Sequence, residues 1–250
     1  MMAPLISIIT PAYKAMAYIG ETIRSVQAQS FTRWEMLIVE DGSPDDTAAV
    51  VKEFADTDPR IQLIRQANAG PAMARQKALD HARGRYIAFL DADDLWLPEK
   101  LSRQLAFMQA HDAVISFTAF RRITADGKGT GRLIHVPERL GYHDLLGNTA
   151  IATSTVLIDS SKSGPLAMTK TYYDDFVLWL GILKRGHVAL GYDEDLMRYR
   201  VLEQSISRNK WRSVRMVWKT YRDVENLSIF RSAVAFGGYA WNAWWKYRGF

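Results

Sequence analysis

The first half of the chain alternates short apolar, β-branched runs with stretches of helical periodicity, and this alternation constrains the fold more than any other feature. The apolar runs predict strands, and the stretches between them predict helices. The predicted strands are 5–10, 34–39, 61–65 and 86–90, and the predicted helices are 18–29, 45–55 and 72–82. Repeated strand–helix units indicate an α/β fold with a mostly parallel central sheet flanked by helices.

The second half is less regular. Apolar runs predict two further strands at 113–121 and 153–159, with a glycine-rich link at 127–131. Residues 174–184 predict a helix, because most of their side chains are apolar over a length typical of helices.

Composition limits the class of protein. The 250 residues, 48% hydrophobic and 24% charged, suit one globular domain with a deep core. The absence of cysteine excludes a disulfide framework, a thiolate metal site and a cysteine nucleophile, and it suits a reducing compartment. The sequence enters a strand directly and has no apolar stretch of about 18 residues, so we expect a cytoplasmic protein without a signal peptide or a spanning helix.

Three polar segments come directly after predicted strands, namely Pro11–Tyr13, Glu40–Asp46 and Asp91–Asp94. In open parallel sheets, ligands bind at the carboxyl ends of the strands, which meet at one edge. These three segments are therefore the first candidates for a binding site.

The sharpest of the three is Asp91-Ala92-Asp93-Asp94. Alternate residues of an extended segment share a side, so Asp91 and Asp93 can point together. Clustered carboxylates suit a hard divalent cation that also holds phosphates. The alternative is a solvated turn in which Asp94 caps a following helix through Lys100.

Four more residues are candidates, each with a structural alternative. Asp41, at a strand end, can accept hydrogen bonds from a ribose or a base, or can belong to a polar turn. Arg75, at the start of a predicted helix, can pair with phosphate, or can be a surface arginine. The pair Asp174-Asp175 opens an apolar helix, where it can complement the helix dipole or supply a general base for an acceptor hydroxyl.

Taken in order, these segments resemble the family-2 glycosyltransferases of the GT-A fold, including those of bacterial surface-polysaccharide assembly of the teichuronic-acid and O-antigen types. The resemblance runs from about residue 5 to 209. Its carriers are Ser7-Ile8-Ile9-Thr10-Pro11-Ala12-Tyr13, Val39-Glu40-Asp41-Gly42-Ser43, Gly70 to Arg75, Asp91-Ala92-Asp93-Asp94, Asp174-Asp175 with Leu178-Trp179-Leu180, and Tyr199-Arg200 with Ser205 and Ser207. It implies a GT-A catalytic domain over 1–207, with a nucleotide-binding half at about 1–112 and an acceptor half at about 113–207, followed by a tail at 208–250.

The resemblance also implies roles. The nucleotide, usually a uridine diphosphate, would be held by Pro11, Ala12, Tyr13, Asp41, Arg75, Asp91, Ala92 and Asp93. A manganese or magnesium ion would be held by Asp93 and Asp91, with Asp94 beside them. The second acidic residue of the later pair is the usual base in the family, so we expect Asp175 in that role, with Asp174 as the fallback. The implied reaction is a single displacement with inversion, from a nucleotide sugar to a hydroxyl of a glycan or an undecaprenyl-linked glycan.

The sequence departs from the family pattern at two places. Many relatives carry a histidine after the Tyr-Arg pair, where this chain has Leu202, and Glu203 or Gln204 are candidates to replace it. The acidic pair is Asp-Asp rather than the commoner Glu-Asp, which leaves the choice of base open between its two members.

The C-terminal segment is basic and aromatic. Residues 198–250 hold 11 lysines and arginines against 3 acidic residues, and five of the eight tryptophans. One predicted amphipathic helix, 208–222, carries an aromatic stripe beside a basic stripe. The first stripe is Trp211, Val214, Trp218 and Tyr221, and the second is Arg208, Arg212, Arg215, Lys219 and Arg222. Such a helix suits an anionic membrane surface, so we expect a peripheral protein at the inner face of the cytoplasmic membrane with a lipid-linked acceptor. The alternative is that the tryptophans pack against the catalytic domain.

Competing functions fit less well. A nucleic-acid-binding module would use the basic tail, but the carboxylate clusters at strand ends would repel phosphate backbones, so we expect no nucleic-acid partner. A nucleotidyltransferase would offer a glycine-rich phosphate loop after the first strand, where this chain has Pro11-Ala12-Tyr13-Lys14-Ala15. A non-catalytic surface or scaffold protein would not need the complete acidic set.

Overall fold

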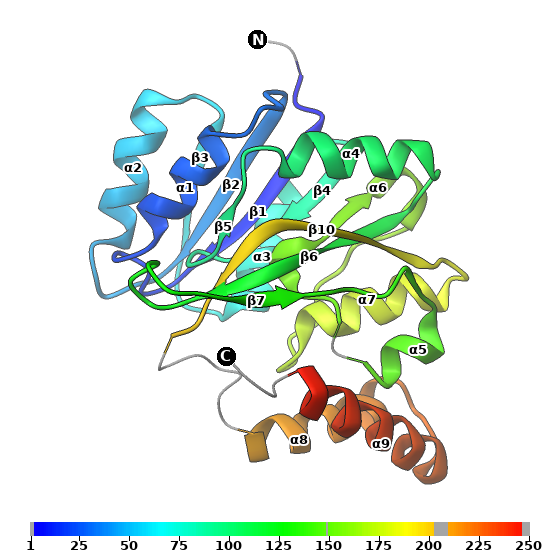
Figure 1. Cartoon of the computed structure of the whole chain (residues 1–250). Coiled ribbons are helices and arrows are strands. Elements are labelled where there is room, and N and C mark those ends of the chain that lie inside the picture. Colours follow the sequence, from blue (N-terminus) through cyan, green and yellow to red (C-terminus); the bar gives the residue numbers. More distant parts are fainter. Residues whose placement is uncertain (1–2, 149, 203–209, 247–250) are drawn as a thin grey trace.

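The computed structural model describes residues 3–148, 150–202 and 210–246, and the statements below refer to these ranges. Within them the chain forms a ten-stranded sheet with helices on both faces (Figure 1). The strands are β1 (Ile6–Ala12), β2 (Trp34–Asp41), β3 (Ile61–Gln66), β4 (Tyr86–Phe89), β5 (Leu95–Trp96), β6 (Ile115–Ile123), β7 (Thr130–Ile134), β8 (Arg139–Leu140), β9 (Leu157–Asp159) and β10 (Ala189–Arg200). The helices are α1 (Ile19–Gln27), α2 (Thr47–Thr57), α3 (Pro71–His81), α4 (Lys100–Ala110), α5 (Tyr142–Leu146), α6 (Ser160–Ser163), α7 (Asp174–Lys184), α8 (Lys210–Lys219) and α9 (Ile229–Lys246), with a 3₁₀ turn η1 (Thr153–Thr155) and a π-helical turn η3 (Thr220–Val224).

The strand order explains why the polar segments meet. The order is β3-β2-β1-β4-β9-β6-β10-β5, with β7 on β6 and β8 on β10. The first four strands pair in parallel, and β9 is antiparallel to both β4 and β6. Strands β6 and β10 therefore run in the direction of the first four, and the carboxyl ends of β1, β2, β4, β6 and β10 lie toward one edge. The α/β fold is confirmed, with a sheet made mixed by β9, β5, β7 and β8.

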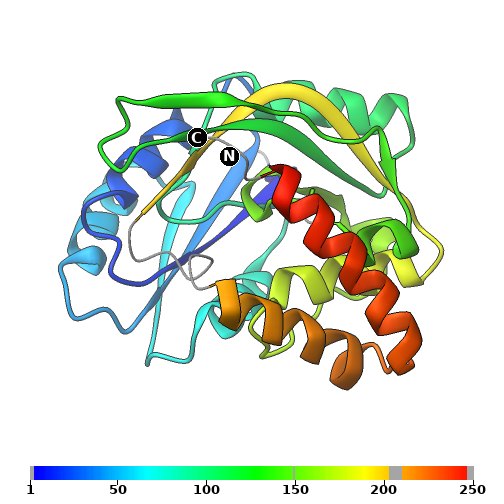
Figure 2. The same ribbon diagram turned by 60° about the horizontal axis from the view of Figure 1, so that its bottom comes forward.

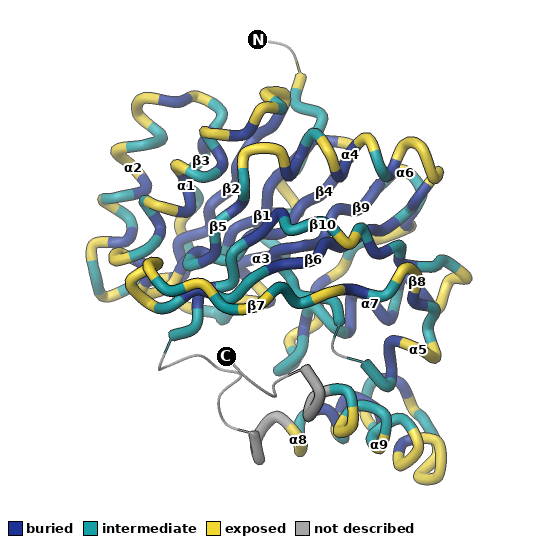
Figure 3. Tube along the Cα trace, in the orientation of Figure 1, coloured by how far each residue is buried: buried dark blue, intermediate teal, exposed yellow. Residues whose placement is uncertain are grey.

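Alternation along the central strands divides the core into two layers. On β1, Ile8 packs into the layer that includes α1 and α2, whereas Ile9 packs into the layer that includes α3 and α7. Both residues are fully buried, as are nearly all residues of β1, β2 and β4 (Figure 3). A strand covered on both faces reads as a continuous apolar run, which is the pattern of this part of the sequence.

β1 extends past its predicted end at Thr10, through Pro11 to Ala12. The carbonyl of Ile9 accepts a hydrogen bond from Leu90 N at 3.0 Å on the β4 side. Two residues on, Pro11 presents its nitrogen to the same side, where β4 has already ended at Phe89. Its missing N–H therefore removes no bond of the ladder.

The structure differs from the sequence-based expectations at three other places. The predicted strand 153–159 begins only at Leu157, because Thr153–Thr155 forms η1. Asp94 does not cap a helix, since β5 follows it and α4 starts at Lys100. The whole of β10 was missed, because its middle carries three acidic residues, Asp193, Glu194 and Asp195.

The C-terminal helices lie beneath α5 and α7 (Figures 1 and 2). The predicted basic helix is present as α8 over 210–219, but its inner side is covered by protein. Val217 and Tyr221 are 2% and 0% exposed, and the ring of Trp218 meets that of Phe236 at 6.0 Å. Residues 203–209, with Glu203, Gln204 and Arg208, lie outside the described residues, as do the side chains of Trp211 and Arg212. No helix within the described ranges is long and apolar enough to cross a bilayer.

Candidate active site

The Asp91–Asp94 turn follows β4 at the carboxyl edge of the sheet. Asp91 and Asp93 are partly exposed, whereas Ala92 and Asp94 are buried, as alternation predicts. Burial, and after it the charge of Asp91, raise the pKa of Asp93 to about 6. The negative charges of the two neighbouring carboxylates repel each other, and a bound cation would relieve this repulsion.

Asp94 is bound within the protein. It is 1% exposed, and it accepts hydrogen bonds from Ser154 Oγ at 2.6 Å and from the Arg200 backbone N–H at 2.9 Å. Burial raises the pKa of this carboxyl well above its usual range. Asp94 therefore anchors the turn from inside, and we leave it out of the metal site proposed below.

Arg75 joins the two acidic segments. Its two terminal nitrogens donate to Asp91 Oδ1 at 2.6 Å and to Asp174 Oδ2 at 2.7 Å, across a sequence separation of 99 residues for the latter. The residue is 6% exposed. Burial lowers its pKa, but the charges of Asp91 and Asp174 outweigh burial and raise it. The alternative of a surface arginine is wrong: Arg75 is a buried bridge between β4 and α7.

The acidic pair at the start of α7 has two different environments. Asp174 is 4% exposed and bound to Arg75; burial raises its pKa, although Arg75 opposes the rise. Asp175 is only partly buried, and its Oδ2 accepts a hydrogen bond from Thr153 Oγ1. Asp174 is thus committed to a contact within the protein, and Asp175 is the more accessible carboxylate.

Asp41 holds the loop that leads into α3. Its Oδ1 accepts from Gln66 Nε2 at 2.7 Å and from Ala69 N at 2.8 Å, and its Oδ2 accepts from Gly70 N at 2.9 Å. Gly70 has a φ of +91°, which favours glycine. Because α3 starts one residue later, Asp41 sets the position of the helix that carries Arg75. A nucleoside contact would use lone pairs of this carboxylate that the loop leaves free.

The segment after β1 is fixed against the loop after β2. Pro11 is partly buried, Ala12 is buried, and Tyr13 is 47% exposed with Lys14 Nζ 5.4 Å from the centre of its ring. Lys14, at a φ of +52°, donates its backbone N–H to Ser43 Oγ at 3.1 Å. Tyr13 is therefore carried on a braced loop with about half of its surface exposed.

Arg200 supports the acidic turn, a role that sequence reasoning missed. It is 2% exposed at the end of β10, and its side chain donates to the carbonyls of Asp93 and Ala125 at 2.9 and 2.8 Å and to Glu21 Oε2 at 2.6 Å. The only signal was its place in the Tyr199-Arg200 motif, because β10 itself was not predicted. Leu202, at the position where the family resemblance led us to expect a histidine, follows two residues later and is partly buried.

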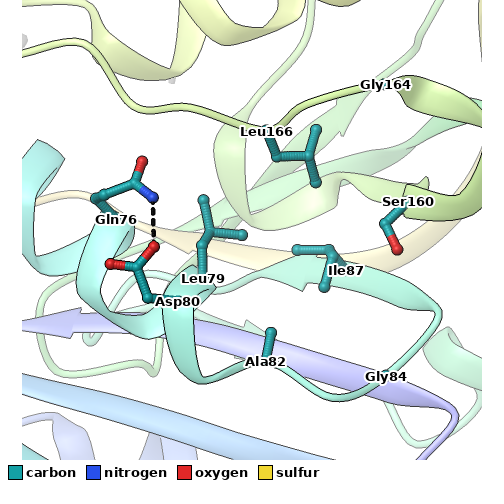
Figure 4. Close-up of a pocket in the computed structure, with 9 residues that line it drawn as sticks. All are labelled: Gln76, Leu79, Asp80, Ala82, Gly84, Ile87, Ser160, Gly164 and Leu166. Carbon is teal, nitrogen blue, oxygen red and sulfur yellow. Dashed lines mark hydrogen bonds between the residues drawn. The ribbon is translucent and has the colours of Figure 1, made fainter.

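A separate cavity lies away from these residues. Figure 4 shows its lining from the second half of α3, the start of β4 and the neighbourhood of α6, including Leu79, Ile87 and Ser160. Its volume is about 280 Å³. Ile87 belongs to the amino-terminal half of β4, and none of the predicted site residues lines this cavity, so it is not the candidate site.

The described residues contain no group of three or more His, Asp or Glu side chains placed to hold a metal ion. Asp91 and Asp93 alone offer partly exposed carboxylate oxygens at the acidic turn. Oxygen ligands of this kind suit manganese or magnesium, and magnesium in particular is commonly held by one or two carboxylates together with phosphates of the substrate. The residues present therefore fit a cation that shares its coordination with a bound diphosphate.

Comparisons with known proteins agree with this architecture. The chain is 42% identical over 242 residues to the putative teichuronic acid biosynthesis glycosyltransferase TuaG of Bacillus subtilis (strain 168), covering 96% of each. It is 36% identical over 225 residues to the UDP-Glc:alpha-D-GlcNAc-diphosphoundecaprenol beta-1,3-glucosyltransferase WfgD of Escherichia coli, covering 89% of this chain and 87% of that protein.

Two solved structures share the fold. The mannosyltransferase PcManGT from Pyrobaculum calidifontis, in complex with GDP-Man and Mn²⁺, has a TM-score of 0.72 at 17% identity, covering 98% of this chain and 72% of that one. S. aureus TarS 1–349 in complex with UDP-GlcNAc has a TM-score of 0.71 at 17% identity, covering 96% and 72%. The expected GT-A fold is confirmed by these likenesses. Residues 7–165 match the model of Glycosyl transferase family 2, and the chain belongs to this glycosyltransferase family.

Proposed function

We propose that this glycosyltransferase moves a sugar from a UDP-sugar to a hydroxyl of a glycan acceptor, with inversion at the anomeric carbon. The observation that carries the proposal is the bridge through Arg75, which holds the acidic turn after β4 close to the acidic pair of α7. A transferase needs a site for the leaving diphosphate and a base for the acceptor, and this bridge brings both together. A nucleotidyltransferase or a binding module would not need the second acidic pair.

On the donor side, Tyr13 would stack on the base, and Pro11, Ala12 and Asp41 would shape the pocket for the nucleoside. Asp91 and Asp93 would hold a manganese or magnesium ion. When bound, such an ion supplies positive charge that stabilises the departing diphosphate. The presence of Mn²⁺ in the PcManGT complex supports this assignment.

On the acceptor side, Asp175 would accept the proton of the attacking hydroxyl as the new glycosidic bond forms and the bond to the diphosphate breaks. A positioned base of this kind contributes about 10²–10⁴-fold to the rate. Asp174, the fallback base, is supported less well, because Arg75 engages its carboxylate in a buried pair.

We further propose an undecaprenyl-linked glycan as acceptor and a peripheral position on the inner face of the cytoplasmic membrane. WfgD and WfaP of Escherichia coli are both named for transfer to a diphosphoundecaprenol-linked sugar. An apolar surface that suits a membrane is present on α9, where Phe230, Val234 and Trp241 are 78%, 63% and 62% exposed. The basic C-terminal segment would favour anionic lipid.

The donor side is tested with a panel of nucleotide sugars in manganese, magnesium or chelator. The variants are Asp93→Asn and the control Asp56→Asn, which removes an exposed aspartate of α2 far from the acidic turn. We expect one UDP-sugar to bind and turn over, and we expect chelator and Asp93→Asn, but not Asp56→Asn, to abolish both. Absence of metal-dependent binding for every nucleotide sugar would overturn the proposal.

The membrane surface is tested by sedimentation with anionic vesicles. Phe230→Glu with Val234→Glu should release the protein, whereas the matched change Val214→Glu on α8, where the sequence placed the membrane stripe, should weaken binding less. Unchanged sedimentation of the double variant would refute the assignment to α9.

A further inference from the structure

The turn η1 contacts both halves of the proposed site. Thr153 Oγ1 donates a hydrogen bond to Asp175 Oδ2. The next residue, Ser154, donates from Oγ to Asp94 Oδ2 at 2.6 Å and accepts at the same oxygen from the Asp91 backbone N–H at 3.0 Å. Adjacent residues of one 3₁₀ turn therefore touch the carboxylate proposed as base and the acidic turn proposed for the donor.

The turn is rigid, because buried partners hold it on several sides. Ser154 and Thr155 are 1% and 0% exposed. The Ser154 carbonyl accepts from Trp96 Nε1 at 2.7 Å, and the Thr155 carbonyl accepts from Gln104 Nε2 at 3.0 Å. Thr155 Oγ1 closes the turn by donating to the Ala152 carbonyl at 2.6 Å. A hydroxyl that projects from such a turn has little freedom to follow a moving partner.

We propose that Thr153 is a positioning residue for Asp175. A hydroxyl has one proton, and Thr153 donates it to Oδ2, while Oδ1 accepts a hydrogen bond from the Phe176 backbone N–H at 2.7 Å. Together the two donors fix the rotation of the carboxylate, and each oxygen keeps a second lone pair that can receive the acceptor proton. Through Ser154, the same turn sets the distance between this carboxylate and the Asp91–Asp94 turn. This link is independent of Arg75, which joins Asp91 to Asp174. The inference rests on the proposed function, since it takes Asp175 as the base.

The test compares Thr153→Val, which keeps the shape and removes the proton donor, with Thr153→Ser, which keeps the donor. Small misplacements of a catalytic group cost up to about 100-fold in rate. We therefore expect Thr153→Val to lower kcat about 10- to 100-fold, and Thr153→Ser to restore most of it. The Kd of the UDP-sugar donor, measured by calorimetry, and the Tm should stay close to those of the wild type.

Two further variants separate positioning from a general structural role. In an Asp175→Asn background, Thr153→Val should cause little additional loss of kcat, because residues that act as a unit are not additive. Ser154→Ala, one position along, should instead weaken donor binding, because Ser154 supports the acidic turn.

Each outcome has a distinct meaning. An active wild type whose kcat is unchanged by Thr153→Val overturns the positioning role and leaves the proposed function intact. The positioning role is also overturned if Thr153→Val weakens donor binding and lowers Tm along with kcat, or if Thr153→Ser does not restore kcat. A wild type that transfers no sugar from any nucleotide sugar overturns the proposed function and this inference together.

Discussion

Replacing Arg75 with methionine should destabilise the fold strongly, and the size of the effect depends mainly on Asp174, the more buried of its two partners. The variant keeps an apolar stem and removes the guanidinium between Asp91 and Asp174. The Asp91 side chain is 30% exposed, so water can replace the lost donor there at a cost of at most about 1 kcal/mol. The Asp174 side chain is only 6% exposed, and leaving a buried charge without its partner costs about 3–5 kcal/mol.

Urea unfolding followed by circular dichroism measures this loss directly. We expect the free energy of unfolding to fall by about 3–5 kcal/mol, which for a domain of this size lowers Tm by on the order of 10 °C. Arg103→Met is the matched control, because Arg103 and its partner Glu194 are 44% and 40% exposed. This exposed pair should contribute less than about 1 kcal/mol.

A second-site variant identifies the source of the cost. If the unpaired charge of Asp174 is responsible, Asp174→Asn should recover part of the stability lost in Arg75→Met. The reasoning is refuted if Arg75→Met costs no more than Arg103→Met, or if Asp174→Asn makes the Arg75→Met protein still less stable.

Three other predictions follow from single sites. A Cβ on Gly191 would lie 2.0 Å from the Pro137 carbonyl oxygen, so Gly191→Ala should lower the free energy of unfolding in urea by about 1–3 kcal/mol. Gly237 in α9 has open space around it, so Gly237→Ala should raise that free energy by about 0.5–1 kcal/mol. Equal effects of the two substitutions would contradict this reasoning. Hydrogen bonds from Arg60 lower the pKa of Asp58 from 3.8 to about 2. The ionised carboxylate therefore stabilises the fold by about 2 kcal/mol above pH 4, and this stabilisation is lost as the pH falls toward 2. Asp58→Asn should therefore flatten the dependence of stability on pH between 4 and 2, and an unchanged slope would exclude this source. Arg200→Lys loses contacts that hold the acidic turn, so we expect it to weaken metal-dependent donor binding, measured by calorimetry, about 10- to 100-fold. An unchanged affinity would show that Arg200 does not support the donor site.

The first four strands and α7 could be predicted because their signals are local. The predicted helix at 174–184 has the same bounds in the structure, and the four apolar runs became β1 to β4 within a few residues. Such strands are buried on both faces, so their composition alone separates them from the loops. The acidic turn after β4 was predictable for the same reason, since it begins where the apolar run stops.

The contacts that organise the site were not predictable, because they join distant parts of the chain. Ser154 and Thr153 lie in a stretch with strand-like composition, and only their partners Asp94 and Asp175 explain why the chain turns there. Arg200 is bound to a turn 107 residues earlier, at the end of a strand whose acidic middle hid it.

The C-terminal stripe illustrates a second limit of periodicity. The regular spacing of Val214, Trp218 and Tyr221 identifies a helix with an apolar side. The spacing does not show whether that side packs on a protein core or on a bilayer, because both are apolar. In the structure, the protein covers Tyr221 completely, Val214 is 37% exposed, and more strongly exposed apolar residues, Phe230, Val234 and Trp241, are on α9. The alternative in which the aromatic residues pack against the catalytic domain is correct for Tyr221, whose hydroxyl donates to the Leu146 carbonyl, whereas Trp218 packs on Phe236 of α9.

The two aspartates that begin α7 divide the work of the site by burial. Both lie in the first turn of a helix, where the dipole favours negative charge. Asp174 turns inward and is bound to Arg75, so its charge serves to hold β4 and α7 together. Asp175 is partly exposed, and its two oxygens accept hydrogen bonds from the Thr153 hydroxyl and the Phe176 backbone N–H. A residue that must both support the frame and exchange a proton would lose its partner at every turnover. Placing the two tasks on adjacent residues would avoid this conflict, and this is a further reason to propose the second carboxylate as the base.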